Sequence, residues 1–271
     1  MKYDPIKKSL GKVFNKNPFL RKVFYKLLDL LLLRAWFVNR ELRNFSKNKP
    51  DDLNILDAGA GFGQYTYYIS KLNKNWNIKA VDVKQEQIDD CNQFFTKIGK
   101  NEKVKFEFAD LTKFTEENKY DLVLSVDVME HILEDVQVFK NFYASMKEGS
   151  MLLIATPSDK AEDHHHHDHE EGEDTDFFVE EHVREGYNID EIKEKLASAG
   201  FKNISVIYSY GKPGTVAWKL SMKIPIVVLN FSKLFFILLP FYYLIVYPWA
   251  YILNHFDLNG THKSGRGLVV K

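Results

Sequence analysis

A glycine-rich turn after a short apolar run is the feature that most constrains how this chain folds. Residues 54–63 (NILDAGAGFG) place an acid at the end of the run and then glycine at every second position. The pattern predicts a buried strand, a tight turn and a helix that begins at about Gln64. Glycine lacks a Cβ, so a ligand can approach the backbone of such a turn closely. The helix start adds unpaired N–H groups and Asp57 adds a carboxylate, so the turn suits a small, partly cationic molecule that contains a nucleoside.

The spacing of the glycines disfavours two common nucleotide sites. A dinucleotide fingerprint needs G-x-G-x-x-G with an acid about 20 residues further on. Here the third glycine comes one residue early, which argues against a nicotinamide-dependent dehydrogenase. A phosphate loop would end in Gly-Lys-Ser/Thr, but Gln64 follows Gly63. The turn instead resembles motif I of the S-adenosylmethionine-dependent methyltransferases with a Rossmann-like fold (class I).

Strands and helices alternate after this turn. Further apolar runs predict strands at 77–83, 104–110, 120–128, 150–157, 203–210 and 265–271, with helices at 64–72, 86–99 and 133–146. Near-continuous apolar strands that alternate with helices indicate a parallel sheet covered on both faces. With the resemblance, the expected fold is α/β. It is a doubly wound, seven-stranded, mostly parallel sheet with an antiparallel last strand, N-terminal amphipathic helices and an apolar helical hairpin inserted between strands six and seven.

Three of the predicted strands end in an aspartate, namely Asp57, Asp82 and Asp110. Each could merely cap the following helix, but ligands of parallel sheets bind at this edge. The resemblance implies that Asp82 takes the ribose hydroxyls and that Asp110 binds the exocyclic amine of adenine. S-adenosyl-L-methionine is therefore the expected cofactor. The predicted cofactor-binding residues are Asp57, Gly59, Ala60, Gly61, Gly63, Asp82, Val83, Asp110, Leu111 and Val126.

The candidate catalytic residues follow the fourth predicted strand. Asp127, Glu130 and His131 form Asp-x-x-Glu-His, which resembles the Glu-x-x-Glu-His of quinone-biosynthesis O-methyltransferases and small-RNA 2′-O-methyltransferases. In those families the three positions hold a divalent metal, so these residues are predicted ligands for Mg or Zn. Methyltransferases without a metal also carry Glu-His here, with the glutamate bonded to the following helix turn. Glu130 and His131 are then the predicted catalytic pair, with His131 as a general base.

The chain divides into four parts by composition. A basic amphipathic arm (1–50) precedes the core (51–211), which contains an acidic, His-rich loop (158–187), and an apolar insertion (212–262) precedes the last core strand (263–271). The arm holds thirteen Lys or Arg against three Asp or Glu, but the whole chain has a formal net charge of zero. Nucleic acid is therefore not an expected partner. The single Cys91 fits a reducing compartment, and no signal peptide is expected, since Asp29 and Arg34 interrupt the only early apolar run.

The arm and the His-rich segment each have more than one interpretation. Apolar residues from Leu20 to Val38 recur at spacings of three and four, which predicts a helix that lies on a membrane, packs on the sheet or covers the cofactor as a lid. Residues 161–176 (AEDHHHHDHEEGEDTD) hold five histidines among acids, so they form either a solvated loop or a substrate lid with metal-binding side chains. His182, Arg184 and Tyr187 follow this segment within reach of a substrate.

The insertion is the most apolar part of the chain. Twenty-one residues between Lys233 and His255 carry no formal charge. Strands six and seven pair with each other in the family fold, so the insertion must leave and return on one side of a membrane. Its prolines can break helices, and its tyrosines and tryptophan suit an interface. We expect a hairpin that dips into one leaflet, while a homodimer interface or an apolar cap over the substrate stays open.

The sequence thus indicates an S-adenosylmethionine-dependent methyltransferase. The expected substrate is an apolar, membrane-resident small molecule (a lipid, a quinone or a pigment precursor) that is methylated on oxygen. We expect a cytoplasmic protein that is peripheral or monotopic on the inner face of the membrane. An RNA methyltransferase and a non-catalytic, membrane-associated S-adenosylmethionine-binding protein are the alternatives.

Overall fold

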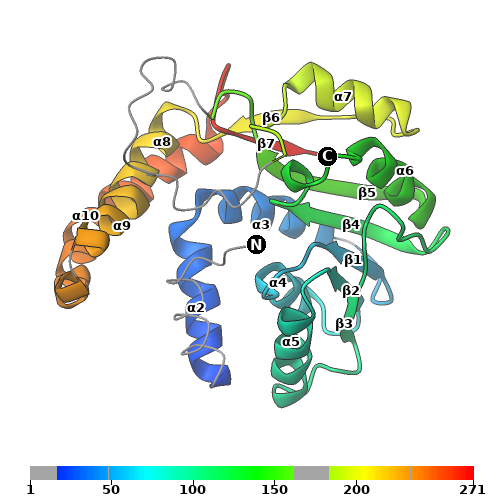
Figure 1. Ribbon diagram of the computed structural model, residues 1–271, viewed down its shortest axis with the longest axis horizontal. Coiled ribbons are helices and arrows are strands. Elements are labelled where there is room, and N and C mark those ends of the chain that lie inside the picture. Colours follow the sequence, from blue (N-terminus) through cyan, green and yellow to red (C-terminus); the bar gives the residue numbers. More distant parts are fainter. Residues whose placement is uncertain (1–16, 48, 162–182, 232) are drawn as a thin grey trace.

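Seven strands form one mixed sheet in the order β3-β2-β1-β4-β5-β7-β6 (Figure 1). The computed structural model describes residues 17–47, 49–161, 183–231 and 233–271. The first five strands are parallel, and β7 runs antiparallel to both β5 and β6. The predicted fold class is confirmed. The strands are β1 (Asn54–Ala58), β2 (Asn77–Asp82), β3 (Val104–Phe108), β4 (Tyr120–Val126), β5 (Met146–Pro157), β6 (Val206–Ser209) and β7 (Gly267–Val270).

Two hydrophobic clusters cover the two faces of the sheet. Neighbouring residues of β1 divide between them, because side chains alternate along a strand: Ile55 belongs to one cluster and Leu56 to the other. Helices α3, α4 and α5 pack into the first cluster, and α6 and α7 into the second. These helices are α3 (Leu33–Ser46), α4 (Gln64–Leu72), α5 (Gln85–Lys97), α6 (Asp135–Ser145) and α7 (Ile189–Ser198).

The sixth strand is shorter than its predicted range of 203–210. It covers only Val206–Ser209, and Asn203 and Tyr210 on either side have φ angles of +58° and +54°. A left-handed residue turns the chain out of the sheet, so the pairing ends at both points. The fifth strand is longer than predicted, since β5 already begins at Met146.

The N-terminal arm is helical, as predicted, and is divided into two helices. Helix α2 (Pro18–Leu31) ends at Leu32, which is extended with φ −91° and ψ 109°, and α3 begins at Leu33. The break lets α3 bury Val38 and Leu42 completely in the core, while α2 projects away from the sheet (Figure 1). Among the interpretations of the arm, packing on the sheet therefore holds for α3.

The insertion between β6 and β7 runs out from the sheet and back. It contains α8 (Lys212–Trp218), the π-helical turn η2 (Lys219–Lys223), α9 (Ile224–Phe231), η3 (Lys233–Ile237) and α10 (Leu239–Asn259). Helices α8 and α10 lie side by side (Figure 1), and the Gly214 N–H donates to the buried Asp257 carboxylate over 2.9 Å. Among the described helices, none combines the length and the apolar character needed to cross a bilayer.

The division into four parts stays a prediction. Most of the acidic, His-rich segment, residues 162–182, lies outside the described residues, and so does His182. Neither interpretation of that segment is tested.

Candidate active site

The turn between β1 and α4 has a left-handed backbone at each of its glycines. The φ angles are +80° at Gly59, +53° at Gly61 and +80° at Gly63. A Cβ at Gly59 would lie 2.2 Å from a methyl group of Val128, and one at Gly63 would lie 2.9 Å from the Phe106 ring. A Cβ at Gly61 would meet nothing closer than the Gln87 side chain at 3.8 Å. Two glycines therefore allow close packing, whereas the middle one faces open space beside the turn.

Asp57 is buried at the end of β1. Its side chain is 2% exposed and accepts a hydrogen bond from the Thr66 hydroxyl. Burial raises the pKa of Asp57 to about 7, although the Thr66 hydroxyl bond and backbone N–H oppose that shift. A carboxyl with this pKa ionises near neutral pH. A cation beside it would lower the pKa, so that the carboxyl ionises at a lower pH.

Asp82 and Asp110 order the loops after their strands. The Asp82 carboxylate accepts the N–H of Gly61 over 2.8 Å and that of Lys84 over 2.9 Å. One carboxylate oxygen of Asp110 accepts both the backbone N–H and the hydroxyl of Thr112, over 3.0 and 2.7 Å. These bonds favour the charged form and hold the pKa of Asp110 below its usual range. Asp82 thus joins the end of β2 directly to the open glycine.

The remaining predicted cofactor residues lie on the same edge of the sheet. Ala60 and Val126 are partly buried, Val83 is exposed, and Leu111 is buried with its carbonyl accepting the Asn141 amide over 2.8 Å. The structure therefore brings all ten predicted residues to the carboxyl ends of β1 to β4. Their individual contacts to a cofactor stay predictions.

Helix α2 contacts the glycine turn, a contact that the sequence analysis missed. Arg21 donates to the carbonyl of Phe62 over 2.8 Å, and the Tyr25 hydroxyl donates to the same oxygen. Arg21 also donates to the Tyr25 hydroxyl and to the Cys91 sulfur, and both Arg21 and Tyr25 are buried. The sequence shows the four-residue spacing that places Arg21 and Tyr25 on one side of a helix. Their partner is a backbone carbonyl, which no sequence pattern marks.

A second missed residue, Arg34 of α3, forms an ion pair with Asp127 at the end of β4. Asp127 has a φ angle of +51°, a conformation that costs a non-glycine residue roughly 1–2 kcal/mol. The two side chains are 29% and 33% exposed, so the pair is accessible. The backbone N–H of Arg34 donates to the Tyr210 hydroxyl over 3.0 Å, and the Arg34 guanidinium interacts electrostatically with Tyr65. The arm, β4 and β6 thus meet in one polar cluster beside the glycine turn.

The predicted metal ligands do not gather around one point. Asp127 faces Arg34, Glu130 is only 1% exposed, and the His131 side chain is exposed. In the described part of the chain, no three His, Cys, Asp or Glu side chains are grouped as metal ligands. The donor set therefore does not fit the predicted Mg or Zn ion.

The burial of Glu130 changes its predicted role. Its carboxylate accepts the Thr156 hydroxyl over 3.1 Å, its backbone carbonyl accepts the Val183 N–H, and burial raises its pKa. Because the side chain is enclosed, it cannot touch a methyl acceptor in this arrangement. The Glu130 carboxylate thus links the short helix η1 (Met129–His131) to Thr156 of β5, while the catalytic role of His131 stays a prediction.

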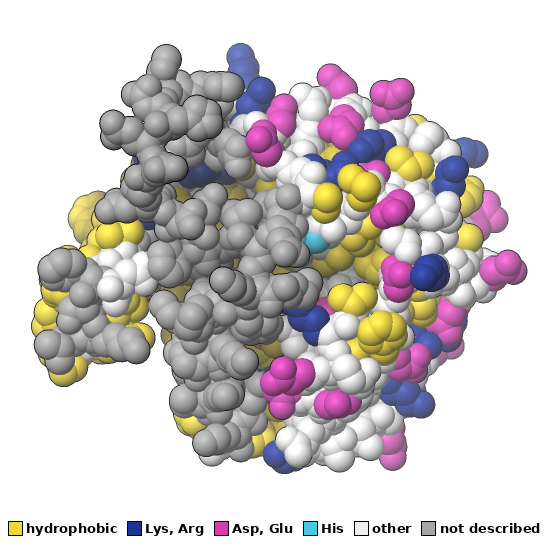
Figure 2. Space-filling model, in the orientation of Figure 1, with side chains coloured by type: hydrophobic (Ala, Val, Ile, Leu, Met, Phe, Trp, Pro, Cys, Tyr) yellow, Lys and Arg dark blue, Asp and Glu magenta, His cyan; other side chains and the backbone are white. Residues whose placement is uncertain are grey.

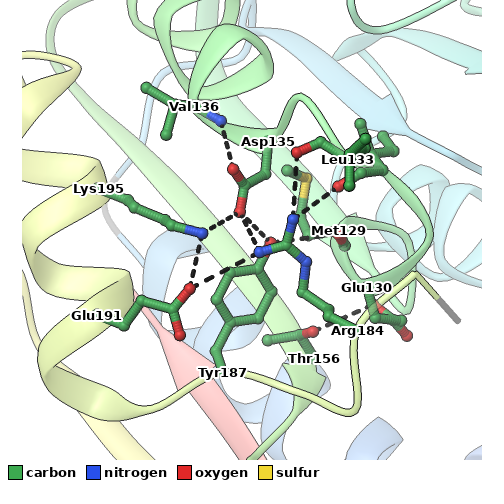
Figure 3. Close-up of polar contacts among 11 residues, drawn as sticks. Met129, Glu130, Leu133, Asp135, Val136, Thr156, Arg184, Tyr187, Glu191 and Lys195 are labelled. Atoms are coloured by element: carbon green, nitrogen blue, oxygen red, sulfur yellow. Dashed lines mark hydrogen bonds and ion pairs between the residues drawn. The ribbon is translucent and has the colours of Figure 1, made fainter.

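Arg184 and Tyr187, predicted to lie near a substrate, are instead bound to Asp135 (Figure 3). One oxygen of Asp135 accepts the Tyr187 hydroxyl over 2.8 Å and pairs with Arg184 over 2.6 Å and Lys195 over 2.8 Å. Arg184 also donates to the carbonyl of Ile132 over 3.0 Å. This cluster ties the chain that follows residue 182 to α6 and α7.

The methyltransferase-domain family matches residues 49–207. This range contains the glycine turn, the three strand-end aspartates and the Asp-x-x-Glu-His segment. The chain belongs to the methyltransferase-domain family. The predicted resemblance to methyltransferases is confirmed at the level of family and fold.

Relatives in the family act on different kinds of molecule, as their names show. The chain is 28% identical over 150 residues to malonyl-[acyl-carrier protein] O-methyltransferase 2 of Ilyobacter polytropus, with 55% of this chain and 54% of that protein covered. It is 30% identical over 110 residues to the ubiquinone biosynthesis O-methyltransferase of Rickettsia bellii, with 40% and 44% covered. The chain thus spans about half the length of these relatives.

Among solved structures, the chain resembles phosphoethanolamine N-methyltransferase 2 of Haemonchus contortus in complex with phosphomonomethylethanolamine and S-adenosylhomocysteine. The TM-score is 0.58 at 18% identity, over 87% of this chain and 52% of that one. At this identity the likeness establishes the shared fold alone.

We expect Gly61→Ala to weaken cofactor binding without unfolding the chain. Both Gly61 and Gly99 have positive φ angles, and a Cβ at Gly99 would meet nothing within 4 Å. Each alanine variant is expected to lose about 1 kcal/mol of unfolding free energy from the left-handed backbone. Only Gly61→Ala places a methyl group in the open space beside the turn, so only it should weaken S-adenosylhomocysteine binding, by tenfold or more in calorimetry. Equal affinity of both variants would refute the placement of the cofactor.

We expect Asp57→Asn to change how stability depends on pH. Between the unfolded pKa of about 4 and the folded value of about 7, the unfolded chain is ionised while the folded chain holds the proton. The wild type should therefore lose about 1.4 kcal/mol of unfolding free energy per pH unit relative to the variant as pH rises through this window. Denaturant unfolding at pH 5, 6, 7 and 8 measures the difference. A difference that does not vary with pH would contradict the raised pKa.

Proposed function

We propose that this chain transfers a methyl group from S-adenosyl-L-methionine to an oxygen of an apolar, membrane-resident small molecule, such as a lipid, a quinone or a pigment precursor. The observation that carries the methyl-donor part is the glycine turn, whose middle residue faces open space while Asp57, Asp82 and Asp110 stand at the adjoining strand ends. Membership of the methyltransferase-domain family supports the same activity.

The residues around the turn fit a nucleoside sulfonium. A side chain at Gly61 would occupy the space that the ligand needs, and the buried Asp57 would be ionised by a neighbouring cation. Asp82 would take the ribose hydroxyls, and Asp110 would bind the adenine amine. When bound, the cofactor supplies an electrophilic methyl group on its sulfur.

The Arg34–Asp127 pair is suited to orient the methyl acceptor. It is accessible, it lies at the end of β4 beside the glycine turn, and Asp127 is held in a strained conformation. A carboxylate held there can accept the hydrogen bond of a hydroxyl acceptor, and orientation is a large part of an in-line displacement. His131, exposed four residues further along the chain, is the nearby base candidate for the hydroxyl proton.

The insertion supports a substrate that resides in a membrane. Its outer surface exposes large apolar side chains, and hydrophobic side chains are visible along the margin of the projecting tip in Figure 2. Leu244 is 76% exposed, Ile245 70% and Trp249 66%. A contiguous apolar surface of this kind marks a protein or membrane contact. The ubiquinone biosynthesis relative is consistent with an apolar acceptor, and we propose a peripheral or monotopic position on the inner face of the membrane.

Methyl transfer can be tested with radiolabelled S-adenosylmethionine and fractions of a host extract. We expect label in an apolar lipid-soluble product and none in RNA, because the chain is neutral overall. Chromatography of the organic and aqueous phases identifies the labelled molecule. Asp82→Asn serves as the inactive control. Label confined to RNA would reverse the proposed substrate class, and cofactor binding without any labelled product would favour a non-catalytic role.

Membrane binding by the insertion can be tested with Leu244→Gln/Ile245→Gln. These exposed side chains can be changed without disturbing the core, whereas deleting the insertion would remove the buried Ala250, Asn254 and Asp257. We expect the double variant to sediment with lipid vesicles at least tenfold less than the wild type. Phe108→Gln, at an exposed apolar position outside the insertion, is the matched control. Equal sedimentation of all three proteins would remove the membrane part of the proposal.

A further inference from the structure

Helix α2 buries Arg21 and Tyr25 while it exposes several large apolar side chains. Its Arg21 and Tyr25 are 2% and 1% exposed, whereas the exposed fractions of Phe19, Val23, Leu27 and Leu30 range from 36% to 69%. The exposed positions recur at spacings of three and four, so they form one continuous side of the helix. A surface helix of a globular protein has the opposite arrangement, so this side calls for a contact outside the chain's own core.

The orientation of α2 is fixed by its buried contacts. Arg21 and Tyr25 both donate to the Phe62 carbonyl, and Asp29 accepts the Gln64 amide over 2.7 Å. Rotating the apolar side inward would break these bonds and leave buried polar groups without partners, at a cost of about 1–3 kcal/mol for each group. The apolar side therefore stays outward while the glycine turn keeps its present form.

The charges on the exposed side of α2 are positive. Lys22 and Lys26 are exposed beside the apolar positions, and the only acid of the helix, Asp29, is turned toward Gln64. The preceding residues 1–16 add five lysines and a single aspartate in sequence. Apolar side chains interleaved with lysines are typical of helices that lie in the interface of an anionic bilayer.

Helix α2 also adjoins the apolar insertion. The Leu30 carbonyl at its C-terminal end accepts hydrogen bonds from the Tyr247 hydroxyl over 3.3 Å and from the Trp36 indole over 3.1 Å. The rings of Trp36 and Tyr251 meet edge to face with their centroids 5.1 Å apart. Both α2 and the α9–α10 pair project beyond the sheet in Figure 1. The C-terminal end of α2 therefore lies next to the insertion that is already proposed to meet the membrane.

We propose that α2 is a second membrane-contacting element, and that its exposed side binds a bilayer that contains anionic lipids. Phe19, Val23, Leu27 and Leu30 enter the interface, and Lys22 and Lys26 pair with lipid phosphates. The inference rests on the proposed function only for the membrane contact of the insertion, not for methyl transfer. The alternative is that the exposed side of α2 binds a second copy of the chain. Binding of that kind would not depend on Lys22 and Lys26.

The test is flotation of the full chain with vesicles in the absence of S-adenosylmethionine. One set of vesicles contains phosphatidylcholine and phosphatidylglycerol in equal amounts, and the other contains phosphatidylcholine alone. Since each lysine near an anionic surface contributes about fivefold in affinity, we expect Lys22→Gln/Lys26→Gln to bind the anionic vesicles at least tenfold less and the neutral ones unchanged. We expect Phe19→Gln/Leu27→Gln to bind both less than the wild type does.

Leu133→Gln is the matched control, because Leu133 is an exposed apolar residue outside α2 and the insertion. Circular dichroism confirms that each variant is folded. The inference is overturned if both α2 variants bind vesicles as strongly as the wild type does. It is also overturned if Phe19→Gln/Leu27→Gln converts a dimer to a monomer while vesicle binding stays unchanged. The flotation assay contains no methyl donor, so its result does not depend on whether the chain transfers a methyl group. Conversely, vesicle binding by the α2 variants neither supports nor contradicts the proposed reaction.

Discussion

The left-handed backbone between β1 and α4 is the constraint on which the rest of the site depends. Gly59 and Gly63 allow Val128 and Phe106 to pack directly against the turn, and Gly61 leaves its outer side open. The Asp82 carboxylate holds the Gly61 N–H and thereby sets the turn against the end of β2. A larger side chain at Gly59 or Gly63 would move β4 or β3 away from the turn, and with them the other acidic strand ends.

The N-terminal arm contributes to this site as much as the sheet does. Arg21 and Tyr25 hold the turn through the Phe62 carbonyl, and Arg34 pairs with Asp127 at the end of β4. The donors lie on two helices that the family range of residues 49–207 does not include. The part of the chain outside the matched family domain thus contacts both the glycine turn and the end of β4. In α2, the same helix carries the contacts to the turn on one side and the apolar, basic surface on the other.

Much of the fold could be inferred from periodicity and turn chemistry. The apolar runs identified all seven strands. The first five are buried parallel strands, which are nearly continuous in apolar residues, and the glycine spacing identified the turn. Boundaries were less certain. Strand β6 is cut short by the left-handed Asn203 and Tyr210, and the arm is broken at Leu32. No glycine or proline lies near Leu32 to signal the break in the arm, whereas Gly211 and Pro213 directly follow the end of β6.

The sequence by itself determined the sheet, the glycine turn and the row of acids, because these follow from local patterns repeated along the chain. Tertiary structure alone decided which side chains remain available for chemistry. It buried Glu130 against Thr156, bound Arg184 and Tyr187 to Asp135, and brought Arg34 to Asp127 across almost a hundred residues. Such pairings depend on the three-dimensional approach of distant segments, and the burial that results sets the charge state and accessibility of each group.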